Sequence, residues 1–267
     1  YEIGVRLVGS EMCIRDRAQV IRQVYPRLGI VPGLILAPGW SQIPEVGLAL
    51  AAKAAKINGV YSAMALLDLD TAKAKKYTDT KSVKEESGYT SPFCYPLWPC
   101  DRVGEYILAK SAVAGAMIQY MASDNEDVPN QSPSNHLLGV GGQCLEDGTE
   151  VYLDQDQANT VNGYGVTTAI NQNGYRLWGN YTGAYPASSD AKDIWFAVRR
   201  MFSWQGNNFI QTYFDEVDDP MNNALVQSVV DSENIRCSAY APKYWAGASI
   251  EYKSDDLSLI HISEPTR

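Results

Sequence analysis

The chain has 267 residues, of which 45% are hydrophobic and 20% charged, and this composition excludes a disordered, collagen-like or coiled-coil protein. It carries 22 Lys and Arg against 31 Asp and Glu, a net charge of −9. We therefore expect no nucleic-acid partner, because a phosphate backbone is bound by clustered cations. We also expect no membrane insertion, since the longest weakly charged run, Val103–Met121, still contains Glu105 and Lys110.

Both ends of the chain resemble translated sequencing-adapter DNA. Leu7–Arg17 reads LVGSEMCIRDR and Leu257–Arg267 reads LSLIHISEPTR. We therefore leave residues 1–17 and 257–267 out of the fold prediction, as one does for expression scars. We expect these segments to make few buried contacts, so that removing Leu7–Arg17 and Leu257–Arg267 changes the melting temperature little.

The first half of the remaining chain alternates short apolar runs with helical patterns. Ser41 is the expected N-cap of the first helix, and Pro44 suits its first turn. An order of strand, helix, strand, helix, strand predicts a parallel sheet covered by helices. The expected elements are a strand at Gly33–Ala37, a helix at Ser41–Asn58, a strand at Tyr61–Leu69, a helix at Thr71–Glu86 and a strand at Ser91–Leu97.

The second half is richer in helix. Asp101–Met121 predicts a helix buried inside a globule, because Ala and Gly favour close packing. The polar run 122–135 is a loop, and the spacing of apolar residues predicts a long helix at Ala191–Val217 that Asp218-Asp219-Pro220 ends. The other expected elements are a helix at Asp154–Asn162, strands at Val166–Ile170 and Tyr175–Trp178, a helix at Asn222–Ala239 and a strand at Ala246–Tyr252.

Catalytic patterns are weak. His136 is the one histidine outside the adapter-like tail, and no GxSxG turn accompanies it, so a Ser/His/Asp hydrolase is disfavoured. Asp68 and Asp70 follow a predicted strand, where catalytic carboxylates often lie, and alternation would point both to one face. The alternative is that Asp70 caps the next helix. Both aspartates remain the candidates for an α/β hydrolase-like enzyme.

The other polar motifs also have structural explanations. Cys94 and Cys100 flank an aromatic stretch, and without further ligands they are predicted to be buried thiols. Gly139, Gly141 and Gly142 lack the spacing of a phosphate-binding loop, and Asp154-Gln-Asp156 lacks the rest of an EF-hand. Arg199-Arg200 is interpreted as an ion-pairing element. We assign no catalytic, cofactor-binding or metal-binding residue.

Four stretches together resemble one family, the contractile tail sheath proteins of bacteriophages. Gly33–Asp70, which reads GLILAPGWSQIPEVGLALAAKAAKINGVYSAMALLDLD, is similar to the central subtilisin-like domain of that family. Ser132–Asn135 with Gly139-Val140, and Ala158–Thr182, resemble later elements of the same domain. Asp193–Arg200 (DIWFAVRR) resembles the helix that opens the C-terminal sheath domain, where paired Arg is usual. WGNYTG departs from the family pattern, which leaves the role of the Arg usual there open.

The resemblance implies an α/β fold with a mostly parallel sheet and helices on both faces at 18–185, followed by a smaller α+β domain at 186–256. It implies a structural subunit that forms a helical tube around an inner tail tube, contracts, and is not a protease. The implied partners are neighbouring sheath subunits joined by strand-exchanging arms, the tube protein and the baseplate. The implied location is the virion tail, after assembly in the bacterial cytoplasm. A sheath of a phage-derived contractile injection system is the close alternative, and an aromatic surface-binding module stays open beside the hydrolase.

Overall fold

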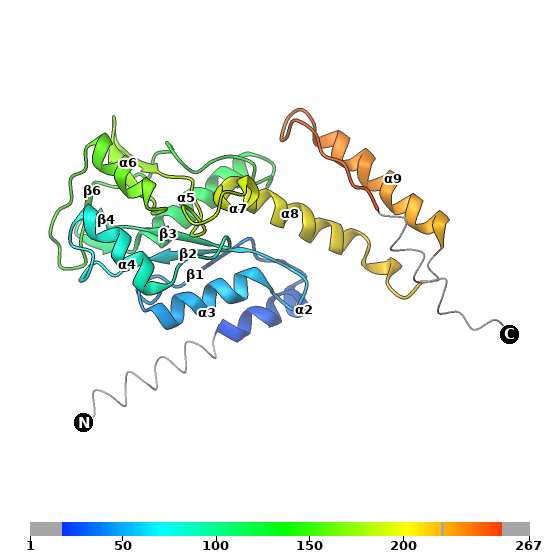
Figure 1. Ribbon diagram of the computed structural model, residues 1–267, viewed down its shortest axis with the longest axis horizontal. Helices are drawn as coiled ribbons and strands as arrows, with labels where there is room; N and C mark the ends of the chain where they lie inside the picture. Colours follow the sequence, from blue (N-terminus) through cyan, green and yellow to red (C-terminus); the bar gives the residue numbers. More distant parts are fainter. Residues whose placement is uncertain (1–17, 220–221, 253–267) are drawn as a thin grey trace, which may run out of the picture. The chain divides into compact units, whose positions relative to one another are not determined.

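The computed structural model describes residues 18–219 and 222–252 (Figure 1). The adapter-like segments 1–17 and 257–267 lie outside these ranges, and so does Pro220, which the sequence pattern predicts to end a helix. The chain divides into two compact units, one reaching to Asn207 and one beginning at Asn208. The division at 207 differs from the domain boundary expected between residues 185 and 186, which was drawn from the family resemblance and stays a prediction.

A three-stranded parallel sheet forms the centre of the first unit. Its strands β1 (Leu34–Leu36), β2 (Met64–Asp68) and β3 (Cys94–Leu97) lie in that order, with Ile35 opposite Ala65 and Leu66 opposite Tyr95. Helix α3 (Pro44–Ala55) covers one face and α5 (Lys110–Asp124) the other (Figure 1). The three strands predicted from apolar runs are confirmed, and so is the mixed α/β class.

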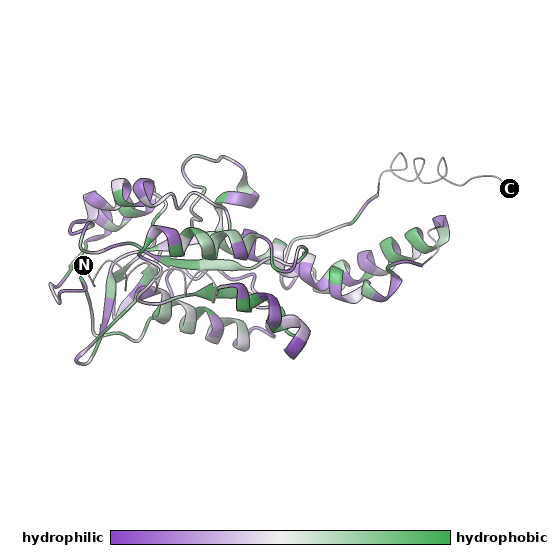
Figure 2. Ribbon diagram, turned by 90° about the horizontal axis from the view of Figure 1, so that it is seen from below, coloured by the Kyte–Doolittle hydropathy of each residue, from purple (hydrophilic) through white to green (hydrophobic). Residues whose placement is uncertain are grey.

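Buried hydrophobic residues lie on both sides of this sheet, against α3 and against α5. All five residues of β2 are buried, because a central parallel strand is covered on both faces. Hydrophobic residues line the middle of the molecule, and the helices carry both hydrophobic and hydrophilic residues along their lengths (Figure 2). The ring of Tyr95 lies 4.1 Å from that of Phe196, between centroids. The core cluster comprises Met64, Leu66, Tyr95, Leu97, Ala114, Met117, Ile118, Leu177 and Phe196.

The helix expected at Asp101–Met121 begins later than predicted. Residues 100–108 form two antiparallel strands, β4 (Cys100–Val103) and β5 (Tyr106–Leu108), and β6 (Gly142–Cys144) joins the other edge of β4. Gly104 supplies the turn with φ +61°, a conformation that glycine adopts at little cost. The β-branched and aromatic residues around that turn favour strand over helix.

The helix expected at Thr71–Glu86 is also shorter. Residues 77–79 form a 3-10 turn, η2 (Tyr77–Asp79), and α4 spans Thr80–Ser87. The main-chain N–H of Lys76 donates to the Asp79 carboxylate, which fixes the chain direction just before the helix. Earlier in the loop the indole N–H of Trp98 donates to the Ala74 carbonyl, so this segment is held by tertiary contacts that no local pattern contains.

The later elements follow the predicted order, with one interruption. Helix α6 (Gln155–Gly163) has Asp154 as its N-cap, and strands β7 (Thr168–Asn171) and β8 (Tyr175–Trp178) form the predicted hairpin. The long helix divides at Trp195 into α7 (Ala191–Ile194) and α8 (Phe196–Thr212), and a 3-10 turn, η3 (Phe214–Glu216), follows. The break arises because Trp195 is extended and forms a β-bridge with Tyr181, on whose ring it stacks.

The second unit contains α9 (Asn223–Tyr240), close to its predicted range, with Asn222 as N-cap. The strand expected at Ala246–Tyr252 does not form. Its Ile250 instead exchanges two main-chain hydrogen bonds with the Asn234 amide, at 2.8 and 3.1 Å. A strand needs a neighbouring strand for its main-chain groups, and among the described residues 246–252 have none. The prediction was therefore wrong.

Candidate functional site

Asp68 holds two distant segments at the carboxyl end of β2. Its carboxylate accepts hydrogen bonds from the Ser41 hydroxyl (2.9 Å) and from the main chain (2.8 Å) and hydroxyl of Ser111. Its own N–H donates to the Ser41 oxygen at 3.0 Å. Burial raises the pKa of Asp68, while the bonds from Ser111 and Ser41 oppose that shift. Ser41 is thus not the helix N-cap, a position that Ile43 occupies.

Asp70 makes a different and local contact. Its carboxylate accepts from the N–H of Ala72 at 2.9 Å, which closes a turn. No helix starts at Thr71, so Asp70 caps a turn and not the helix expected there. The two aspartates therefore do not form a carboxylate pair with a shared task.

A buried ion pair lies beside Asp68. The Lys110 ammonium contacts the Asp101 carboxylate, and both side chains are fully buried. Burial raises the pKa of Asp101, and the Lys110 charge opposes the shift. Because breaking such a pair leaves an uncompensated charge, it fixes the start of α5 against β4. Sequence reasoning missed this pair, although a lone Lys opening an apolar helix was a signal.

A pocket of about 320 Å³ opens at these strand ends, with Asp68, Thr71, Cys100 and Glu146 among its lining residues. His136 does not line it. The main-chain carbonyl of His136 accepts from Leu177 N–H at 2.9 Å, so this histidine lies along β8. Among the residues that the structure describes, no imidazole base lies beside Asp68, and they do not assemble the constellation of a Ser/His/Asp hydrolase there.

The predicted thiols are free. Cys94 is buried, and burial raises its pKa to about 12, as it does that of the less buried Cys100. Thiols of this kind are poor nucleophiles and poor metal ligands. Within residues 18–219 and 222–252 no group of three His, Cys, Asp or Glu side chains could hold a metal ion. Over the same ranges, no helix combines the length and apolarity that a membrane span requires.

Arg199 and Arg200 differ in their surroundings. The Arg199 guanidinium pairs with Asp193 at 3.0 Å and lies over the Phe93 ring, 4.8 Å from its centroid. This agrees with the interpretation as an ion-pairing element. Arg200 is mostly buried, and burial lowers its pKa to about 10.

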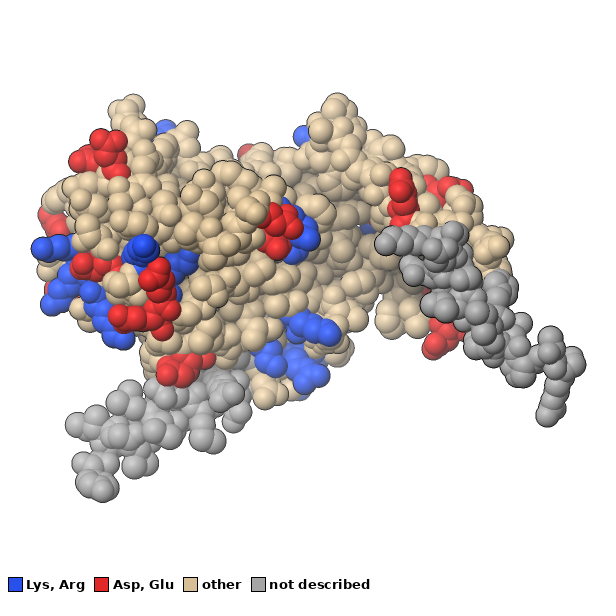
Figure 3. All heavy atoms as spheres, viewed as in Figure 1, with Lys and Arg blue, Asp and Glu red and all other residues tan. Residues whose placement is uncertain are grey.

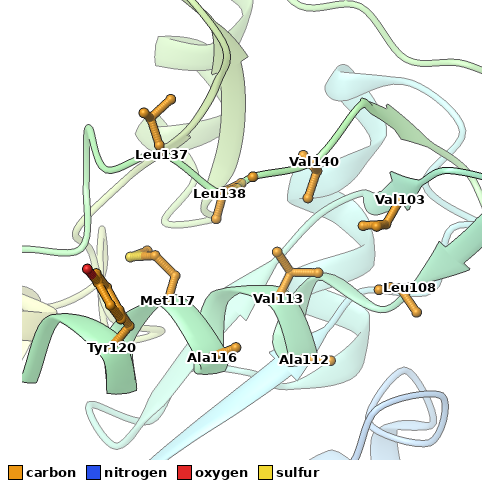
Figure 4. Close-up of a pocket in the computed structure, with 11 residues that line it drawn as sticks. Val103, Leu108, Ala112, Val113, Ala116, Met117, Tyr120, Leu137, Leu138 and Val140 are labelled. Atoms are coloured by element: carbon orange, nitrogen blue, oxygen red, sulfur yellow. The ribbon is translucent and has the colours of Figure 1, made fainter. Parts of the chain in front are cut away.

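A second pocket, larger than the one beside Asp68, is apolar. We name it the α5 groove: its volume is about 540 Å³, and it is bounded by Val103 and Leu108, by Ala112, Val113, Ala116, Met117 and Tyr120 of α5, and by residues 137–140. Figure 4 shows Leu137, Leu138 and Val140 above α5, with Val113 and Met117 of α5 pointing toward them. No lining residue is charged, so the groove suits an apolar surface better than a polar substrate.

Comparison with known proteins identifies relatives of one kind. The chain is 26% identical over 229 residues to the tail sheath protein of Escherichia phage P2, covering 82% of this chain and 52% of that protein. It is 31% identical over 206 residues to a putative prophage major tail sheath protein of Pseudomonas aeruginosa UCBPP-PA14, covering 74% and 48%. The chain is a homologue of phage tail sheath proteins. It spans about half the length of these two relatives.

Solved structures give the same answer for the fold. The sheath of the extracellular contractile injection system PVC, in its contracted state, matches this homologue with a TM-score of 0.68 and 15% identity, covering 92% of this chain and 68% of that one. The contracted helical sheath of the anti-feeding prophage matches with a TM-score of 0.63 and 18% identity, covering 91% and 67%. No family model matches the sequence. The fold is therefore that of contractile sheath subunits.

Proposed function

We propose that this tail sheath homologue is a structural subunit of a contractile tail, which polymerises into a helical sheath around an inner tube. The observation that carries the proposal is the coincidence of two likenesses over the same chain. More than 90% of it has a sheath fold, and 74–82% aligns in sequence with phage tail sheath proteins.

The proposal includes contraction that drives the tube through the host envelope, with neighbouring subunits, the tube protein and the baseplate as partners. It places the subunit in the virion tail, after assembly in the host cytoplasm. Residues 18–185 then belong to the subtilisin-like sheath domain and 186–256 to the C-terminal one. The sheath of a phage-derived contractile injection system is the alternative origin, because the chain aligns in sequence with phage tail sheath proteins and in fold with injection-system sheaths. The genes that neighbour the source gene distinguish the two origins.

The same proposal assigns no enzymatic activity, cofactor or metal to the subunit. The Asp68 carboxylate is hydrogen-bonded to Ser41 and Ser111, and His136 lies along β8. These internal hydrogen bonds explain why a carboxylate is buried at this position without any substrate. This supports the sheath assignment over the hydrolase alternative.

Electron microscopy of the complete protein from the source genome, produced together with the neighbouring tube protein, tests the proposal. We expect hollow helical tubes that surround a thinner tube and that shorten and widen on treatment with mild denaturant. A complete protein that stays monomeric at high concentration with the tube protein present would refute the sheath assignment.

A further inference from the structure

Helix α5 is apolar on two faces, and only one of them meets the sheet. Ala114 and Ile118 are buried on the face toward β1 and β2, and a Cβ added at Gly115 would lie 3.3 Å from Leu36. The second face lines the α5 groove, where Ala116 and Tyr120 are exposed. A helix that is hydrophobic around its circumference is normally covered on all sides.

The α5 groove is bounded on one side by the end of β5 (Tyr106–Leu108), and acidic residues lie near it. Every residue of β5 is exposed, including Tyr106 at 75%, and β5 is an outer strand of its sheet. Glu105, in the turn before β5, and Asp124, one turn of α5 beyond Tyr120, are both exposed. The α5 groove is thus an apolar depression with a carboxylate near each end.

The opposite side of the sheet carries a protruding apolar surface. Leu28, Ile30 and Val60 are 67%, 59% and 56% exposed, around the ring contact of Tyr25 with Tyr61 at 5.0 Å. We name these three residues the α2 edge, because they adjoin the end of α2 (Val24–Leu28), on the α3 side of the sheet (Figure 1). Arg22, Arg27 and Lys56 are exposed next to it.

The charges of these two surfaces are complementary although the chain as a whole is acidic. Figure 3 shows a group of Lys and Arg side chains where α2 and the end of α3 lie, separate from a second group at the left of the view that is mixed with Asp and Glu. Two copies with net charge −9 repel one another on average, so they associate best where apolar surfaces meet and basic residues face acidic ones.

We propose that the α5 groove of one copy receives the α2 edge of a second copy, with Arg22, Arg27 and Lys56 facing Glu105 and Asp124. The two surfaces differ and lie on opposite sides of one unit, so each copy keeps one groove and one edge free. Such a heterologous contact adds subunits head to tail, which gives a ring where the rotation between neighbours closes and an open helical chain where it does not. The inference rests on the proposed function, because a helical sheath requires a head-to-tail contact between different surfaces of its subunits.

Sedimentation velocity of the 267-residue chain over a concentration series tests the contact directly. We expect reversible self-association that Ala116→Glu in the groove and Val60→Glu in the edge each weaken at least about tenfold in dissociation constant. Both positions are exposed, so the variants should keep the circular dichroism spectrum of the parent chain. Ala187→Glu, at an exposed loop position outside both surfaces, is the matched control and should associate like the parent.

Mixing the two variants distinguishes this contact from other modes of association. The Val60→Glu chain keeps an intact groove and the Ala116→Glu chain keeps an intact edge, so the mixture should form one-to-one pairs that grow no further. A strictly monomeric parent chain, a mixture that stays monomeric, or equal weakening by Ala187→Glu would overturn the proposal. None of these results depends on tube formation, so failure here leaves the sheath assignment to its own test.

Discussion

The side-chain amide of Asn207 pairs with the main chain of Ser62 as a neighbouring strand would. Its oxygen accepts from Ser62 N–H at 2.9 Å, and its nitrogen donates to the Ser62 carbonyl at 2.7 Å. The two residues are 145 positions apart, so this contact attaches α8 to the chain entering β2. The contact thereby satisfies the N–H and the carbonyl of Ser62, which lies two residues before β2.

We predict that Asn207→Ala lowers the free energy of unfolding by about 2 kcal/mol, because two hydrogen bonds are lost and a main-chain pair is left unsatisfied. Chemical denaturation would measure the change. Asn208→Ala, at the next position of the same helix, should cost less than about 0.5 kcal/mol. Similar losses in both variants would show that helix propensity, and not the Ser62 contact, determines the effect.

Two glycines should respond in opposite directions to the same substitution. A Cβ at Gly183 would lie 2.3 Å from the Cys94 sulfur and 2.5 Å from the Tyr89 carbonyl oxygen. Gly183→Ala should therefore reduce the thermal midpoint by many degrees or prevent folding. A Cβ added at Gly206, inside α8, would meet no atom within 4 Å other than those of its chain neighbours and of its own helix backbone, so Gly206→Ala should stabilise the helix by up to about 1 kcal/mol. A tolerated Gly183→Ala would contradict the packing described around β3.

Lys84 should make stability rise with pH in the weakly alkaline range. Its ammonium donates to the carbonyls of Tyr164 and Tyr185, and burial lowers its pKa from 10.5 to about 8. Between pH 8 and about 10 the unfolded chain therefore binds more protons than the folded chain, so the free energy of unfolding increases with pH, by at most about 1.4 kcal/mol per pH unit.

The difference between the parent chain and Lys84→Met isolates this effect. Denaturation at pH 7.5, 8.5 and 9.5 should show a steeper rise for the parent than for the variant. Lys73→Met removes an exposed lysine of the preceding loop and should leave the slope of the parent chain unchanged. Parallel slopes for the parent and Lys84→Met would mean that Lys84 titrates normally.

We predict no hydrolysis of esterase or peptidase substrates beyond the buffer rate. Asp68→Asn and His136→Ala should each leave that background unchanged, because Asp68 is bonded to two serines and His136 lies along β8. Circular dichroism on the same samples would confirm that both variants are folded. A measurable rate that collapses in either variant would support the hydrolase alternative.

Sequence patterns predicted the elements whose apolar character is continuous. The runs around Leu34, Met64 and Cys94 became the parallel strands because a buried central strand needs hydrophobic residues on both faces. The role of Asp68 was not predictable in this way. Its partners are ordinary serines 27 positions before it and 43 after it, and nothing local distinguishes Ser41 or Ser111 from other serines.

Two errors have a common physical cause. Residues 101–108 were expected in a helix and 246–252 in a strand, yet the first segment pairs with β6 and the second has no described strand beside it. A strand forms its hydrogen bonds with another strand, often one distant in the chain, whereas helical hydrogen bonds are local. The α5 groove could not be predicted from the sequence for a related reason. An apolar helix has the same sequence pattern whether its second face is covered by another segment or exposed.

The fully buried thiol of Cys94 provides this protein with an internal label for opening of the fold. It is enclosed by the main chain of Ser91, by Gly183 and by the end of α4, near Lys84. A thiol reagent added in solution can modify it only in molecules whose β3 has separated from those segments. Mass spectrometry of the modified peptide would then read the opening of the parallel sheet in assembled and free subunits alike, without an added probe.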